Sequence, residues 1–109
     1  MKKSIDIINK YADTSISLAQ LYELEIIYST ISVYFGLRLT DNQVSALTSF
    51  AFDVGLSTLF EESSIATYLL DGNLIAAKRE IRTFNKNGRM ASAKLTARRE
   101  DEIKLLCEG

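Results

Sequence analysis

Carboxylates are the side chains that could do acid–base chemistry in this sequence, because it contains no histidine and one cysteine, Cys107. Without histidine, the usual general base, the usual metal ligand and every Ser–His or Cys–His nucleophile pair are excluded. A lone cysteine near the end of the chain forms no intramolecular disulfide, and we interpret it as incidental. With no zinc spacing and no phosphate-binding loop, we expect neither a metal nor a cofactor.

The carboxylates themselves do not form a convincing catalytic pair. Glu23 and Glu25 lie two residues apart in a predicted helix and therefore point to different faces. Glu61 and Glu62 lie in a predicted turn, where a solvated pair is the simpler interpretation. Asp53 has an unusual setting, FAFDVG near a predicted helix end, and bonding of its side chain to nearby backbone is a simpler explanation than catalysis.

The bulk composition is that of one soluble globular domain over residues 1–109, with 47% hydrophobic and 25% charged residues. No apolar run approaches the roughly 20 residues that a membrane span requires. The residues after Lys2 and Lys3 do not form the apolar region of a signal peptide. We therefore expect a cytoplasmic protein that does not enter a membrane.

Positive charge is concentrated in the last third of the chain. Residues 1–77 carry four basic and nine acidic side chains, whereas residues 78–109 carry nine basic and five acidic ones. Such a surface could meet a nucleic-acid backbone or an anionic wall polymer, although a solvated helical surface is the simpler interpretation. The candidate basic residues are Lys78, Arg79, Arg82, Arg89, Arg98 and Arg99.

The elements that must position these residues are predicted to be helices, because apolar residues recur every three or four positions and none alternate for long. Two capping boxes, Ser17–Gln20 and Thr40–Gln43, open helices that end before Gly36 and at Gly55. Residues 85–94 are the most loop-like segment. The predicted helices are residues 5–11, 18–35, 41–54, 65–70, 74–84 and a last one from Thr96, with Arg98, Arg99 and Glu102 facing outward.

An ordered set of motifs resembles the helical lobe of the phage-type lysozymes, the endolysin family of muramidases. The motifs are SISLAQLYELE, LTDNQVSALTSFAFDVG, the LLDGN turn, TFNKNGR and LTARREDEIKLL, which together cover roughly residues 15–106. The resemblance implies a compact all-α, lysozyme-like domain, with residues 15–109 as the helical lobe and residues 1–14 as the remnant of a first helix. It also implies a glycan cleft, of which Asp53, Phe84 and Asn85 are the candidate remnants.

Departures from the family pattern bear on activity. The resemblance puts Ala12 where the family has its catalytic glutamate, and the chain passes from Asp13–Thr14 directly to the long helix, without the family's small β-lobe. Asp53 stands where asparagine is usual, Phe84 where tryptophan is common, and Lys94 where glycine is usual. These departures argue against hydrolysis, and we expect no catalytic residue.

Three hypotheses follow from the sequence. The first is a catalytically inactive, phage- or prophage-encoded binding protein that regulates or inhibits a protein partner or forms a homo-oligomer. The second is a peptidoglycan-binding remnant or weak muramidase. The third is nucleic-acid binding through the basic last third of the chain.

Overall fold

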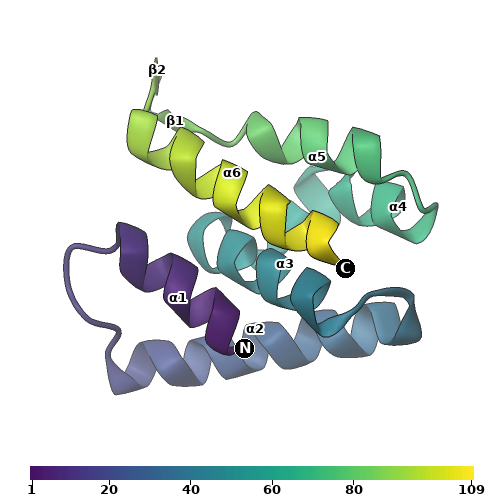
Figure 1. The fold of residues 1–109 in the computed structure, drawn as a ribbon, viewed down its shortest axis with the longest axis horizontal. Helices are drawn as coiled ribbons and strands as arrows, with labels where there is room; N and C mark the ends of the chain where they lie inside the picture. Colours follow the sequence, from purple (N-terminus) through teal and green to yellow (C-terminus); the bar gives the residue numbers. More distant parts are fainter.

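Helices carry almost all of the secondary structure in the computed structural model, which describes residues 1–109 (Figure 1). A 3-10 turn, η1 (Gly36–Arg38), a π-helical turn, η2 (Thr58–Glu62), and a hairpin of two short strands, β1 (Lys86–Asn87) and β2 (Met90–Ala91), connect them. The predicted all-α class is therefore confirmed. The helices are α1 (Lys2–Tyr11), α2 (Leu18–Phe35), α3 (Asp41–Val54), α4 (Ile65–Leu70), α5 (Leu74–Arg82) and α6 (Ala93–Glu108).

The predicted capping boxes begin α2 and α3. The hydroxyls of Ser17 and Thr40 each accept a hydrogen bond at 3.2 Å, from the backbone N–H of Gln20 and Gln43 respectively. Each glutamine side chain accepts one in return at 2.9 Å from the N–H of its capping residue. These reciprocal bonds satisfy backbone donors that a helix start otherwise leaves without partners.

Helix α3 is the centre of the fold. All eight residues from Val44 to Ala51 are buried, and α1, α2 and α6 pack around the helix (Figure 1). Phe50 is fully buried and packs edge-on against Phe84, with ring centroids 5.4 Å apart. At its end Gly55 has φ +99°, a value that L side chains rarely adopt. Because α3 is covered on all sides, its polar residues need partners from neighbouring helices.

Helix α6 corrects two sequence expectations. The helix begins at Ala93 rather than near Thr96, because the hydroxyl of Ser92 accepts a hydrogen bond from the N–H of Leu95 at 3.2 Å. Arg98, Arg99 and Glu102 were expected to face outward, but all three are buried. Their burial follows from mutual pairing, described below.

The loop-like segment before α6 folds into the antiparallel hairpin. Lys86 pairs with Ala91 and Asn87 with Met90, and both strands are exposed. The strands are too short for an alternating pattern to predict them. None of the helices has both the length and the apolar character needed to cross a bilayer.

Candidate functional site

A pocket of about 320 Å³ lies at the C-terminal end of α1, between that end, α3 and the hairpin. We call it the α1-end pocket. Asp53 is the one carboxylate among its lining residues. The pocket is lined by Tyr11, Asp53, Asn87, Ser92, Lys94, Leu95 and Arg98.

Ala12, where the resemblance expects a catalytic acid, lies directly after the last residue of α1. It is exposed and leaves the helical conformation (φ −81°, ψ 148°), while its N–H still donates to the carbonyl of Ile8 at 2.9 Å. A methyl group can neither donate nor accept a proton. The end of α1 is therefore in place, but the position carries no chemistry.

Two contacts fix α1 against the rest of the fold. At its start, the buried hydroxyl of Ser4 donates to the carbonyl oxygen of Ser45 in α3 at 2.6 Å. At its end, the hydroxyl of Tyr11 and the ammonium of Lys10 both donate to Asp101 in α6, at 2.5 and 2.9 Å. These contacts hold the tyrosine ring at the wall of the α1-end pocket.

Burial and the hydrogen bonds at the end of α1 shift the pKa of Tyr11 and that of Asp101. Burial and the hydrogen bond to Asp101 raise the pKa of Tyr11 above its usual 10.0. For Asp101, burial acts to raise the pKa, but the hydrogen bonds from Tyr11 and Lys10 outweigh it and lower the pKa below its usual 3.8. Over the wide range between those values, the tyrosine is a neutral donor and the aspartate a charged acceptor.

A largely buried polar network connects α3 with α6, and two of its members, Asp53 and Arg98, also line the pocket. The guanidinium of Arg99 forms ion pairs with both Asp53 and Glu102. Glu102 also accepts from the hydroxyl of Ser49 at 2.5 Å and from Arg98 at 3.2 Å, and Arg98 donates to the carbonyl of Ser49 at 2.8 Å. No buried side-chain polar atom lacks a partner. The network thus meets the condition under which charges are tolerated inside a protein.

Glu102 has one property of a catalytic acid but not the accessibility. Burial raises its pKa, against the opposing effects of Arg99, Ser49 and Arg98. A raised pKa is what a general acid needs. However, the side chain is 1% exposed and does not line the pocket, so a substrate cannot reach it.

The structure brings together some of the predicted cleft residues and separates others. Asp53 lines the α1-end pocket, but its partner is Arg99, so the expected bond to nearby backbone is wrong. Phe84 and Asn85 do not line it. The carbonyl of Phe84 accepts from Arg99 at 2.8 Å, and the amide of Asn85 donates to Thr96 at 3.1 Å.

The sequence did not predict several other residues that line the α1-end pocket. Asn87 and Ser92 reach the pocket because the hairpin folds back beside the start of α6. Gly88 in NKNGRMAS, which takes φ +67° in the turn between the strands, was the available signal for that hairpin. Lys94 lines the pocket and pairs with Asp13 at 3.4 Å, so a departure from the family pattern is part of the site.

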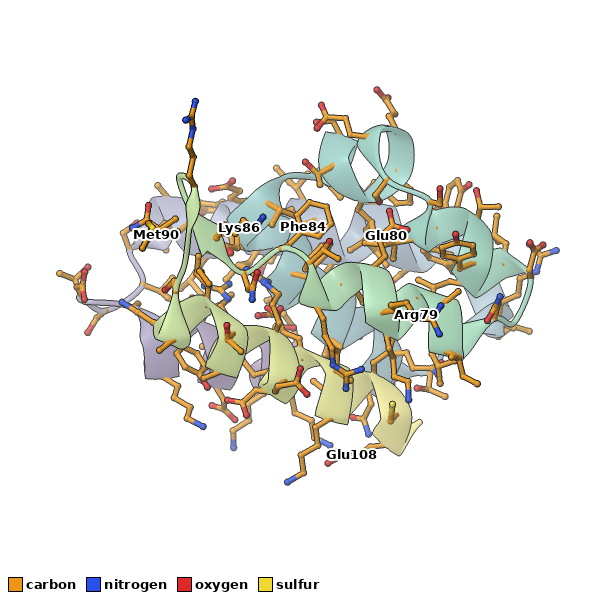
Figure 2. The ribbon with its side chains drawn as sticks, turned by 90° about the horizontal axis from the view of Figure 1, so that it is seen from above. Arg79, Glu80, Phe84, Lys86, Met90 and Glu108 are labelled. Carbon is orange, nitrogen blue, oxygen red and sulfur yellow. The ribbon has the colours of Figure 1, made fainter.

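The predicted basic surface is only partly a surface. Arg98 and Arg99 are buried in the network, so their assignment to it is wrong. Arg82 is exposed but forms a two-bond ion pair with Glu100 at 2.8 and 3.2 Å. Lys78 and Arg79 lie on α5 with Arg82, and Figure 2 shows Arg79 well away from Lys86 on the hairpin. Nucleic-acid binding stays an untested prediction.

The chemistry available in the α1-end pocket is binding by hydrogen bonds and charge. Asn87, Ser92 and Lys94 supply N–H and O–H donors, and Tyr11 adds an aromatic ring. No group of three or more potential metal ligands lies together in the described chain. A larger hollow of about 600 Å³ between α2 and α3 also includes Asp53, but its lining is mostly apolar.

A helical lobe with this order of helices, ending its first helix beside a polar pocket, defines a lysozyme-like domain. Comparison with known proteins agrees: the phage lysozyme family model matches residues 4–102, and the chain belongs to that family. The resemblance predicted from the sequence is confirmed.

Relatives within the family include two endolysins. The endolysin of Bacillus phage PZA is 39% identical over 73 residues, which cover 67% of this chain and 28% of that protein. The endolysin of Bacillus phage B103 is 40% identical over 70 residues, covering 64% of this chain and 26% of that protein. The aligned region thus corresponds to about a quarter of the length of these relatives.

Proposed function

We propose that this chain binds the glycan strands of peptidoglycan in the α1-end pocket and does not hydrolyse them by itself. The observation that carries the proposal is the state of the pocket. Of the three candidate cleft residues it contains Asp53 but not Phe84 or Asn85, and its one carboxylate, Asp53, is paired with Arg99.

Peptidoglycan offers groups that match this lining. Its sugars carry many hydroxyl and amide groups, and its stem peptides carry carboxylates. Asn87 and Ser92 can form hydrogen bonds with the hydroxyl and amide groups of the sugars. Lys94 can donate to the carboxylates of the stem peptides. The two related endolysins support a wall polymer as the ligand class.

Hydrolysis lacks support from the same residues. Cleavage of a glycoside needs an acid and a second carboxylate on opposite sides of the bond, about 5 to 9.5 Å apart. Asp53 has no second carboxylate in the pocket lining. A chain that binds without cleaving could regulate or inhibit active lysozymes by occupying their substrate, which is the form we propose for the regulatory role expected from the sequence.

Weak muramidase activity is the second candidate, and one contact favours it. Asp13 forms an ion pair with Lys94, so a second carboxylate lies at the edge of the pocket. Its side chain is 96% exposed, whereas a glycosidase acid is usually held in a partly apolar cleft. We therefore rank binding above catalysis.

Co-sedimentation with insoluble peptidoglycan at low and high salt tests the proposal. The protein is expected to pellet at both. Lys94→Ala should weaken binding roughly tenfold, as expected for loss of a charge-assisted hydrogen bond. The control is Lys86→Ala, which removes the same side chain from the neighbouring hairpin without touching the pocket lining.

Assaying the same samples for released reducing ends separates the two candidates. Release above a protein-free control would establish hydrolysis and overturn the non-catalytic part of the proposal. Protein that stays in the supernatant at both salt concentrations would overturn binding itself. The cytoplasmic localisation expected from the sequence stays a prediction, which fractionation of producing cells checks.

A further inference from the structure

Helix α2 is apolar on two opposite faces. One face packs on the core through Leu24, Ile27, Ile31 and Phe35, all buried. The opposite face, at the edge of the molecule in Figure 1, is not covered by any other element. A surface helix of a monomer normally turns polar residues outward. The outer face of α2 therefore requires an explanation that the fold alone does not supply.

We call this outer face the α2 stripe. Its large members are exposed by between 62% and 106%, the highest value belonging to Leu37 in the turn after the helix. They are Leu18, Tyr22, Ile26, Val33 and Leu37. The exposed Ser29 lies between Ile26 and Val33 on the same face. Helix α2 contains no lysine or arginine, and its two charged residues are Glu23 and Glu25.

The spacing of the stripe is the spacing of a helix-packing seam. Tyr22, Ile26, Ser29 and Val33 follow one another at intervals of four, three and four residues. This alternation keeps a row of side chains facing one partner helix, as in coiled coils. The small Ser29 near the middle allows two helices to approach closely.

The area of the stripe suits a protein interface. At their exposed fractions, the five large residues present on the order of 700 Å², counting roughly 150–200 Å² for a fully exposed large residue. The largest apolar patch on a typical monomer is about 300–600 Å². A standard interface buries about 800 Å² on each partner.

We infer that the stripe is the interface of a homodimer in which two α2 helices pack antiparallel about a twofold axis near Ile26 and Ser29. This register brings Tyr22 of each copy opposite Val33 of the other, and Leu18 opposite Leu37. Leu37, the most exposed apolar residue, then lies beside the start of α2 in the second copy. This places it next to the apolar hollow lined by Ala19 and Tyr22. The two outer pairs of stripe residues thereby gain apolar neighbours, and Ile26 lies opposite the small Ser29.

Charge supports the antiparallel arrangement. In this register Glu23 and Glu25 of one copy lie opposite Ser32 and Thr30 of the other, rather than opposite glutamates. A parallel pair would bring the four carboxylates together, and like charges at close range repel. A membrane surface is a poorer occupant, because membrane-binding helices usually carry basic residues beside the apolar face and α2 has none.

The inferred dimer is separate from peptidoglycan binding. None of the residues that line the α1-end pocket belongs to α2. The dimer thus goes beyond the proposed function and can be tested without a ligand.

Sedimentation equilibrium across a concentration series is the test. The native chain is expected to dimerise, and Ile26→Glu to weaken the dimer roughly 100-fold, because a carboxylate would be buried in an apolar interface. The matched control is Ile75→Glu. Ile75 on α5 is 68% exposed, close to the 65% of Ile26, but lies outside the stripe.

The outcomes discriminate clearly. A native chain that stays monomeric throughout the series overturns the inference, and so does an Ile26→Glu chain that dimerises as tightly as the native one. Equal weakening by Ile75→Glu also overturns it, since the interface would then lie elsewhere. Val33→Glu repeats the test at a second stripe position, and the circular dichroism of each variant shows that it is folded.

Discussion

The exposed surface of the α1-end pocket and the buried network behind it hold their polar groups in different ways. At the surface, Ala12 and Lys94 are exposed, at positions where the resemblance leads us to expect a glutamate and a glycine. Behind it, Arg99, Glu102, Arg98 and Ser49 form a network in which no buried polar atom lacks a partner, and Arg99 also pairs with the partly exposed Asp53. The difference indicates that the buried charges are held by mutual pairing, whereas the groups at the pocket surface are free to meet a ligand.

Breaking the network should have the largest effect. Arg99→Met removes the guanidinium that pairs with both Asp53 and Glu102. The buried carboxylate of Glu102 then keeps Arg98 as its one cationic partner. Loss of one partner of a buried ion pair typically costs about 3–5 kcal/mol, so the free energy of unfolding should fall by about that much. Urea unfolding followed by circular dichroism measures it.

The control is Arg82→Met, which breaks the exposed ion pair with Glu100. Both side chains are about half exposed, at 51% and 49%, so the expected loss is at most about 1 kcal/mol. Equal effects of the two substitutions would mean that the buried network is not a special support of the fold.

Sequence reasoning succeeded where structure is local. The capping boxes at Ser17 and Thr40 and the glycine at the end of α3 lie within a few residues of the groups that they satisfy. Both capping boxes formed as predicted. The burial of Leu24, Ile27 and Ile31 on one face of α2 likewise follows from their spacing. Such features could be read from short segments because the interactions that define them are short-range.

Sequence reasoning failed where the burial of a side chain depends on partners far along the chain. Arg98, Arg99 and Glu102 were assigned to a solvated surface, since charged residues are rarely buried unless they are paired. Their partners Ser49 and Asp53 are about fifty positions away, in α3. The pocket residues Asn87 and Ser92 also depend on the hairpin, whose strands are two residues long.

A smaller loss of stability is expected when the contact between Tyr11 in the pocket wall and Asp101 in α6 is weakened. Tyr11→Phe removes the hydroxyl that donates to Asp101 but keeps the ring. Hydrogen bonds to charged groups contribute about 1.5–3 kcal/mol, and partial exposure of Asp101 should reduce the loss to about 1 kcal/mol. Thermal unfolding of the two chains at neutral pH measures the difference.

The pH dependence of that difference follows from the two pKa shifts. Because the pKa of Asp101 is lowered, its contribution is present above 3.8 and is lost as pH falls below that value. Because the pKa of Tyr11 is raised, its contribution is present below 10.0 and is lost as pH rises beyond it. The stabilities of the native and Tyr11→Phe chains should therefore converge at both extremes, and a constant gap would contradict this account of the contact.

The smallest expected effect is on the hydrolysis of peptidoglycan. It tests most directly whether the pocket surface can support catalysis. Ala12→Glu restores a carboxylate at the end of α1, at an exposed position where a longer side chain meets little resistance. We expect no release of reducing ends from peptidoglycan, because the pocket still lacks a free second carboxylate. If the variant did cleave peptidoglycan, one side chain would separate binding from catalysis in this chain. Asp13→Asn in that variant would then test whether Asp13 supplies the second carboxylate, since a muramidase that uses it would lose activity again.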